Sequence, residues 1–257
     1  MKYGLIGGKL GHSYSKIIHE MIGAYEYELH PLTKDEFDSF MTKKDFLGIN
    51  VTIPYKQDVI PYLYHIDEKA ARIGAFNTIV NHDGNLYGYN TDFDGFLYTI
   101  KKYEIEIEGK KVLVLGKGGA SKAVLAVLSY LGASDILTVY YKESPGTITP
   151  SDAISLHADA DVIVNTTPVG MYPDVDSSPI DLTPFTSLSA VLDVIYNPLE
   201  TKLLKQANEQ LGIKTASGLD MLSAQAVYAS EYFQGKKLCG SEAEYVEFID
   251  KITKSLM

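Results

Sequence analysis

The stretch that decides the fold is KVLVLGKGGASKA, residues 111–123. KVLVL is an apolar run typical of a buried strand, and the residues from Ala120 onward favour a helix. Gly116, Gly118 and Gly119 stand between the two elements. Glycines here permit a tight turn and let the backbone approach a pyrophosphate, which the free N–H groups of the helix can bind. The stretch therefore predicts a Rossmann-like nucleotide site. The alternative is a glycine-rich turn that binds nothing, since the spacing is not a strict G-x-G-x-x-G.

Short apolar runs alternate with helical patterns after this stretch. Such alternation predicts an α/β domain with a parallel sheet and right-handed crossovers. The polar segment 104–110 precedes the stretch and marks a boundary. The expected strands are residues 136–140, 162–165, 190–194 and 214–216, and the expected helices are 120–131 and 201–211.

A second α/β domain is predicted before that boundary. Asp83-Gly84 has the composition of a hairpin turn, and Thr33 with Glu36 matches a capping box. Ser13 or Ser15 is expected near the N-cap of the first helix. The expected strands are residues 2–7, 25–30, 48–53, 76–82 and 86–89, and the expected helical segments are 13–24, 33–41, 59–64, 67–73 and 92–103.

Two further helices, 218–233 and 242–255, close the chain. We expect them to fold back onto the first domain. The predicted organisation is thus a domain of residues 1–101 completed by 218–257, and a nucleotide-binding domain of residues 102–217.

The composition restricts the class of partner. A net charge of −10 argues against nucleic acid, because phosphate contacts need clustered lysine and arginine, and it also disfavours an anionic membrane. Cys239 is the only cysteine, so no disulfide forms within the chain and a reducing, cytoplasmic compartment is expected. The apolar start of the chain is too short for a signal peptide or a membrane span. No histidine pair has metal-ligand spacing, so no metal is expected. A monomer and a homodimer both fit these observations.

A series of segments carries a resemblance to a known family. Taken in order, they resemble the motifs of the shikimate dehydrogenase family over nearly the whole chain. The resemblance implies an enzyme that reduces 3-dehydroshikimate to shikimate with a nicotinamide cofactor, NADP or alternatively NAD, in aromatic amino-acid biosynthesis. It also implies an N-terminal substrate domain and a Rossmann-like cofactor domain. The segments are GHSYS (11–15), NVTIPYK (50–56), GAFNT (74–78), NTDFDG (90–95), GKGGASKA (116–123), NTTPVGM (165–171), DVIYNPLET (193–201) and GLDMLSAQA (218–226).

By this resemblance, Lys56 and Asp92 are the candidate catalytic pair. Ketone reduction needs a proton on the new alkoxide as hydride arrives, and a lysine in suitable surroundings supplies one. Asp92 would hold Lys56 in place and bind a substrate hydroxyl. The structural alternatives are a solvated lysine and an aspartate that caps the helix beginning there.

Further residues are implied as contacts to substrate and cofactor. Ser13 and Ser15 match a Ser-x-Ser that binds the substrate carboxylate, the alternative being helix capping alone. Lys16 adds a positive charge beside them. His12 is expected to be a packing residue of that loop. The other substrate-binding candidates are Thr52, Asn77, Tyr196 and Gln225, and the cofactor-binding candidates are Gly116, Gly118, Gly119, Ala120, Lys142, Val194 and Gly218.

The adenosine end of the cofactor site departs from the family. Related chains have Asn-Arg-Thr or Asn-Arg-Ser after the second strand, where the arginine holds the 2′-phosphate of NADP. Here Tyr140 and Tyr141 stand in their place, and the polar stretch 143–150 is expected to replace the following helix. Lys117 lies inside the glycine loop.

Two other functions remain open at this point. One is a quinate/shikimate dehydrogenase that uses NAD. The other is a non-catalytic nucleotide- or metabolite-binding module on the same fold, against which the retention of both Lys56 and Asp92 argues.

Overall fold

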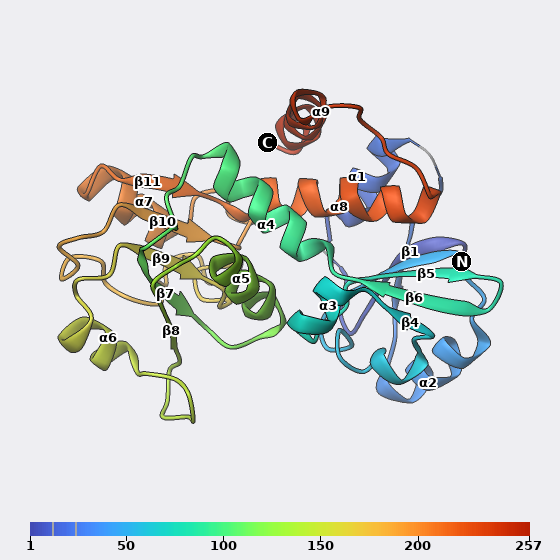
Figure 1. Cartoon of the computed structure of the whole chain (residues 1–257), viewed down its shortest axis with the longest axis horizontal. Helices are drawn as coiled ribbons and strands as arrows, with labels where there is room; N and C mark the ends of the chain where they lie inside the picture. The colour runs from blue at the N-terminus through green and yellow to red at the C-terminus, as the bar shows by residue number, and fades with distance from the viewer. Residues whose placement is uncertain (12, 24) are drawn as a thin grey trace. The chain divides into compact units, whose positions relative to one another are not determined.

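The structure is a computed structural model that describes residues 1–11, 13–23 and 25–257, so His12 lies outside the described residues. The chain forms two compact units. The first joins Met1–Gly95 to Ser223–Leu256, and the second comprises Phe96–Leu222 with Met257 (Figure 1). This division falls inside helices α4 (Thr91–Lys102) and α8 (Gly218–Gln234), whereas the predicted boundaries lie near the ends of these helices.

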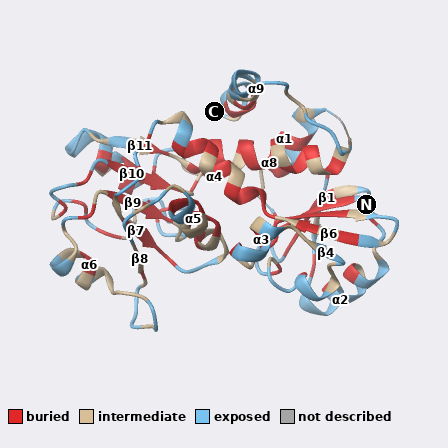
Figure 2. Ribbon diagram, viewed as in Figure 1, coloured by how far each residue is buried: buried red, intermediate tan, exposed pale blue. Residues whose placement is uncertain are grey.

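The second unit contains a sheet of parallel strands in the order β11-β10-β9-β7-β8. Figure 2 shows its central strands buried, and their apolar runs carry the core residues Leu113, Ile163 and Val191. The strands are β7 (Lys111–Leu115), β8 (Asp135–Val139), β9 (Val162–Asn165), β10 (Ala190–Asp193) and β11 (Lys214–Ala216), and the helices between them are α5 (Gly119–Tyr130), α6 (Pro150–Leu156) and α7 (Lys202–Lys205), which continues into the π-helix η2 (Gln206–Gln210).

Strand order identifies where a ligand is expected in this sheet. β7 pairs with β8 on one side and with β9 on the other, so the order of the strands along the chain reverses at β7. In open α/β sheets ligands bind beyond the carboxyl ends of the strands at such a switch point. Here those ends are Leu115 of β7 and Asn165 of β9.

The sheet of the first unit is mixed, in the order β2-β1-β3-β5-β6-β4. β5 runs antiparallel to β3 and β6, and the Asp83-Gly84 turn between β5 and β6 has positive φ at both residues, as a hairpin turn of this length requires. The strands are β1 (Tyr3–Gly7), β2 (Glu28–Pro31), β3 (Gly48–Val51), β4 (His65–Ile66), β5 (Thr78–His82) and β6 (Asn85–Tyr89). The helices are α1 (Ser15–Ile22), α2 (Lys34–Lys43), the 3₁₀ turn η1 (Ile60–Tyr62), α3 (Glu68–Ile73) and α9 (Glu242–Ser255), together with the parts of α4 and α8 that belong to this unit.

Ser13 and Ser15 lie on either side of Tyr14, the N-cap residue of α1, as predicted, and the Ser13 hydroxyl accepts from the Ser15 amide at 3.2 Å. One local prediction is wrong. The helix after β8 is not replaced by a polar loop: α6 forms, capped by Thr149 and Asp152, which exchange hydrogen bonds in a capping box.

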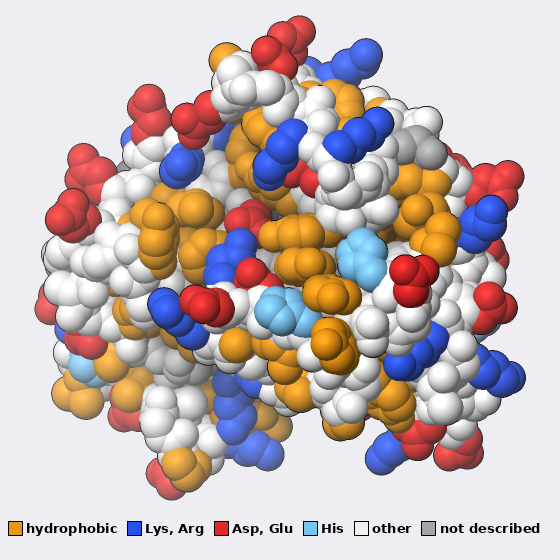
Figure 3. Space-filling model, turned by 45° about the vertical axis from the view of Figure 1, so that its right-hand side comes forward, with side chains coloured by type: hydrophobic (Ala, Val, Ile, Leu, Met, Phe, Trp, Pro, Cys, Tyr) orange, Lys and Arg blue, Asp and Glu red, His pale blue; other side chains and the backbone are white. Residues whose placement is uncertain are grey.

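No helix within residues 1–11, 13–23 and 25–257 is long and apolar enough to cross a membrane. On the face drawn in Figure 3, acidic and basic side chains are interspersed with hydrophobic ones. The charge of this face is therefore divided among small groups of both signs.

Candidate active site

Lys56 and Asp92 are in direct contact in the first unit. Nζ of Lys56 lies 2.5 Å from Oδ2 of Asp92, and their side chains are only 14% and 12% exposed. Lys56 follows Tyr55, whose ring is buried and whose hydroxyl donates to the Leu32 carbonyl at 2.8 Å. The carbonyl of Lys56 also accepts from the Phe76 amide at 2.8 Å. The lysine is thus held by a packed backbone beside a carboxylate, and it is not a solvated surface side chain.

Asp92 lies in the first turn of α4, but it does not cap that helix. The capping hydrogen bond comes from Asn90, whose Oδ1 accepts from the Phe93 amide at 3.3 Å. Both Asp92 carboxylate oxygens face polar side chains instead: Oδ1 accepts from Asn77 Nδ2 at 2.9 Å and Oδ2 contacts Lys56. The carboxylate is therefore oriented for a role other than capping.

The structure also brings Asn77 and Gln225 into this group. Thr91, adjacent to Asp92, receives a hydrogen bond from Asn77 Nδ2 at 3.1 Å and donates to Gln225 Oε1 at 3.5 Å. Gln225 is buried and comes from α8, far away in the sequence. Lys56, Asp92, Asn77 and Gln225 therefore form one connected polar cluster of the first unit.

The serine and threonine candidates belong to the same unit. Ser15 is buried and Ser13 half-buried at the start of α1. Thr52 follows β3, and its amide donates to the Ile6 carbonyl of the neighbouring strand at 2.9 Å. Among the residues that the structure describes, the Thr52 hydroxyl makes no hydrogen bond. Lys16 is exposed, and its Nζ lies 3.6 Å from Oε1 of Glu20, one helical turn away.

The glycine loop follows β7 at the switch point of the second sheet. Gly116 has φ of 102°, and a Cβ there would lie 2.9 Å from Thr166 Oγ1 and 3.0 Å from Thr167 Cγ2. Its amide donates to the Val139 carbonyl at 2.8 Å, which ties the loop to the end of β8. Gly118 is the N-cap of α5 without a side-chain cap, and Gly119 and Ala120 begin the helix. This arrangement fits a pyrophosphate, because the free N–H groups and the positive helix end have room above a backbone without side chains.

Val194 and Gly218 approach each other through their backbones. The Gly218 amide donates to the Ile195 carbonyl at 2.9 Å, and a Cβ at position 218 would collide with the Val194 carbonyl. Tyr196, half-buried, lies in the same loop and belongs to the second unit. Glycine at position 218 is thus required by close packing against the Val194 loop.

Asp193 is the last residue of β10, directly before this loop, and is not among the residues predicted from the sequence. It is 2% exposed and accepts three hydrogen bonds: from Asn165 Nδ2 at 3.0 Å, the Ile195 amide at 3.0 Å and the Thr201 hydroxyl at 2.8 Å. Burial raises the pKa of Asp193 from 3.8 to about 6, although these hydrogen bonds lower it. The signal in the sequence was a charged residue at the end of an apolar strand, within DVIYNPLET.

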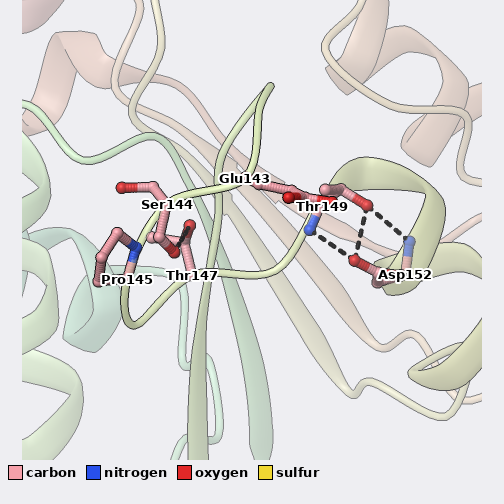
Figure 4. Close-up of a pocket in the computed structure, with 6 residues that line it drawn as sticks. All are labelled: Glu143, Ser144, Pro145, Thr147, Thr149 and Asp152. Carbon is pink, nitrogen blue, oxygen red and sulfur yellow. Dashed lines mark hydrogen bonds between the residues drawn. The ribbon is translucent and has the colours of Figure 1, made fainter.

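The segment after β8 gathers lysines and tyrosines. Lys117 Nζ lies 4.3 Å from the centre of the Tyr140 ring and 2.6 Å from Ser144 Oγ. Lys142 is exposed, with its Nζ 5.2 Å from the Tyr141 ring centre. Figure 4 shows the neighbouring surface pocket, of about 380 Å³, between this segment and the start of α6. Lys117 of the glycine loop and Lys142 of this segment therefore lie on aromatic faces, close to the position for which the resemblance implies an arginine.

The chain is similar to known proteins in sequence and in fold. Residues 5–79 match the family model described as the shikimate dehydrogenase substrate binding domain. The shikimate dehydrogenase (NADP(+)) of Clostridium beijerinckii is 39% identical over 249 residues, which cover 90% of this chain and 91% of the relative.

Solved structures agree with this match. A chorismate mutase/shikimate 5-dehydrogenase fusion protein from Clostridium acetobutylicum superposes with a TM-score of 0.88 at 38% identity, covering 99% of this chain and 96% of that one. Shikimate 5-dehydrogenase from Thermus thermophilus, solved with NADP(H) and shikimate, has a TM-score of 0.84 at 28% identity, with 98% and 99% covered. The chain therefore belongs to the shikimate dehydrogenase family.

Proposed function

We propose that the protein is an NADP-dependent shikimate dehydrogenase that interconverts 3-dehydroshikimate and shikimate. The observation that carries the proposal is the contact of 2.5 Å between Lys56 and Asp92 in a largely buried polar cluster. A module that only binds a nucleotide or a metabolite has no need of such a pair. Membership of the family, with relatives named as NADP-dependent enzymes, supports the cofactor.

Lys56 is the general acid of ketone reduction in this proposal. The bound nicotinamide supplies the hydride to the carbonyl carbon. As negative charge develops on the carbonyl oxygen, the Lys56 ammonium donates its proton, and the alkoxide becomes the hydroxyl of shikimate. In the reverse direction the neutral amine takes that proton back. Asp92 holds Nζ in place.

Neutral polar groups hold the substrate in this proposal. Ser13 and Ser15 bind its carboxylate at the start of α1, where hydroxyls and free N–H groups suit an anion. Thr52, Tyr196 and Gln225 bind its hydroxyls and carboxylate, since a ring with several hydroxyls needs donors and acceptors in fixed positions. Asn77 serves the substrate only through Asp92, because its N–H groups and its oxygen are already hydrogen-bonded to Thr91, Asp92 and Thr78.

The cofactor is held by the second unit. Gly116, Gly118, Gly119 and Ala120 bind its pyrophosphate, and the fit is supported by the space above Gly118, where a Cβ would meet nothing within 4 Å. Val194 and Gly218 offer backbone to the nicotinamide, and Lys142 lies on the side expected for the adenosine. A cytoplasmic location belongs to the proposal as well, because a single cysteine suits a reducing compartment.

The test is steady-state kinetics with shikimate and with quinate, each with NADP and with NAD. We expect turnover with shikimate and NADP, and weaker activity with quinate. Turnover that favours quinate and NAD would support the quinate/shikimate dehydrogenase instead. Absence of turnover in all four mixtures, with cofactor binding retained, would leave only the binding module.

Lys56→Ala tests the assignment of the acid. Because a general acid acts mainly in the transition state, kcat should fall by about 10²–10⁴-fold while calorimetry still detects shikimate binding. Lys251→Ala, which removes an exposed lysine of α9, is the matched control and should leave kcat unchanged. A Lys56→Ala protein within a few fold of the wild-type kcat would refute the assignment.

A further inference from the structure

The side-chain amide of Asn77 has a single possible orientation. Its Oδ1 accepts from the backbone N–H of Thr91 at 2.7 Å, and a backbone N–H can only donate, so this atom must be the oxygen. Nδ2 consequently faces Asp92 and donates to its Oδ1 at 2.9 Å. The second N–H of the amide goes to Thr91 Oγ1 at 3.1 Å.

Asn77 Oδ1 lies within hydrogen-bond distance of two hydroxyls as well, that of Thr78 at 3.0 Å and that of Thr91 at 3.3 Å, and Thr78 is the nearer. Its hydroxyl donates to Asn77 Oδ1 at 3.0 Å and accepts from Asn50 Nδ2 at 3.1 Å. Asn50 in turn accepts from the Tyr27 hydroxyl at 2.7 Å. Followed from Tyr27, each group therefore donates to the next, through Asn50, Thr78 and Asn77 to Asp92, whose other oxygen contacts Lys56.

The network is closed to water. The side chains of Thr78 and Thr91 are 0% exposed, and Tyr27, Asn50 and Asn77 are all at or below 5%. A buried polar group that loses its partner cannot recover one from solvent, and neighbouring hydrogen bonds in such a network depend on each other. Loss of one hydroxyl therefore affects the groups further along.

We propose that Thr78 is a positioning residue of the active site. Its hydroxyl holds the Asn77 amide in the orientation that presents Nδ2 to Asp92, and thereby fixes the carboxylate beside Lys56. The inference rests on the proposed function, since proton transfer at Lys56 is what the positioning serves. Thr78 itself touches no reacting group and acts only through Asn77 and Asp92.

Thr78→Val tests this inference, because valine keeps the shape of threonine and removes only the hydroxyl. We expect kcat with shikimate and NADP to fall roughly fivefold to tenfold, the usual effect of one lost hydrogen bond, while KM changes by less than about twofold. Thr78→Ser restores the hydroxyl and should recover kcat to within about twofold of the wild type.

Thr253→Val is the matched control. Thr253 is a buried threonine of α9 in the same unit, and its hydroxyl has no hydrogen-bond partner among the residues described. The same substitution there should leave kcat and KM unchanged. If Thr78→Val behaved like this control, or if Thr78→Ser failed to recover kcat, the positioning role would be overturned.

A double-mutant cycle separates positioning from a general effect on the fold. If Thr78 acts through Asp92, Thr78→Val should lower kcat by less than about twofold when Asp92 is already replaced in Asp92→Asn. An equal fold loss in both backgrounds would show that Thr78 acts by another route. Should Thr78→Val fail to fold, Tyr27→Phe removes the first donor of the network, and its smaller loss of kcat must likewise vanish in the Asp92→Asn background.

A crystal structure of Thr78→Val distinguishes this inference from the proposed function. In that structure the Asp92 carboxylate should be displaced from Nδ2 of Asn77. This displacement is visible whether or not the enzyme turns over. An Asn77–Asp92 distance unchanged from 2.9 Å would overturn the inference even if the wild type oxidises shikimate. Conversely, a wild type without activity would refute the proposed function while the displacement still showed that Thr78 positions Asp92.

Discussion

The side-chain amide of Asn165 donates to the carboxylate of Asp193 at 3.0 Å, at the carboxyl ends of the paired strands β9 and β10. The same carboxylate accepts from the Ile195 amide and from Thr201, the N-cap residue of α7. Asp193 thus connects two strand ends, a helix start and the loop that carries Val194.

The burial of the Asp193 carboxylate makes the free energy of unfolding depend on pH. Because the pKa of Asp193 is raised to about 6 in the folded state, the folded protein holds that proton more tightly than the unfolded chain. The stability from this group is therefore complete below about pH 4 and is lost as the pH rises through about 6. We expect the free energy of unfolding of the wild type, relative to Asp193→Asn, to be larger at pH 5 than at pH 7 by about 1 kcal/mol. Urea unfolding of both proteins at the two pH values measures it, and a difference that grows towards pH 7 would contradict the assigned direction.

Replacing Ser13 and Ser15 together by alanine should weaken substrate binding. A hydroxyl that donates to a carboxylate contributes roughly 1.5–3 kcal/mol, so KM for shikimate should rise by at least about tenfold while the affinity for NADP stays unchanged. Calorimetry with each ligand separates the two effects. A wild-type KM would mean that the serines serve only the start of α1, where Ser13 already accepts from the Ser15 amide.

Gly116 and Gly118 provide a matched pair for the glycine loop. Gly116→Ala should destabilise the protein by roughly 1–3 kcal/mol, because φ of 102° is unfavourable for alanine and the new Cβ would press on Thr166 and Thr167. Gly118→Ala should leave the Tm unchanged, since φ is −81° and nothing lies within 4 Å of its Cβ. If a pyrophosphate approaches this backbone, Gly118→Ala must nevertheless weaken NADP binding. Unchanged NADP affinity in Gly118→Ala would place the pyrophosphate elsewhere.

The sequence predicted best those elements whose signal is local. β7, β9, β11 and α9 begin and end at the predicted residues. The apolar runs of β7 and β9 are bounded by polar residues or glycine, Lys110 and Gly116 for β7 and Asp161 and Thr166 for β9. β4 was not predicted: it has only two residues, His65 and Ile66, and exists because β6 offers it an edge. α6 was also not predicted, although Thr149 and Asp152 form a capping box that marks its N-terminus.

The sequence likewise predicted some residues of the candidate site and missed others. Motifs pointed to Lys56 and Asp92, and the structure brings them into contact. No pattern in the sequence shows that the Thr78 hydroxyl accepts from Asn50 and donates to Asn77, because Asn50 lies on β3 and Thr78 on β5, and these strands pair only after folding. Asp193 was likewise unassigned, since its partners Asn165 and Thr201 lie on separate elements.

We expect the choice between NADP and NAD to depend on the lysines beside the glycine loop. Arg72 is the only arginine and belongs to the first unit, so a bidentate guanidinium clamp for a 2′-phosphate is absent from the second unit, Phe96–Leu222, all of which the structure describes. Lys117 is the better placed lysine, because its Nζ is held 2.6 Å from Ser144 Oγ and over the Tyr140 ring. Lys142 is exposed, with its Nζ 5.2 Å from the centre of the Tyr141 ring.

A lysine neutralises a phosphate as a point charge, with less geometric control than an arginine. We therefore expect NADP to be preferred over NAD by a smaller factor than an arginine clamp would give. Lys117→Ala should remove most of that preference by lowering kcat/KM for NADP about tenfold while leaving kcat/KM for NAD nearly unchanged. Lys142→Ala should have the smaller effect, and binding of 2′-AMP, followed by calorimetry, should weaken in the same order. A strong preference for NADP that survives the loss of both lysines would show that the 2′-phosphate binds away from the end of β8.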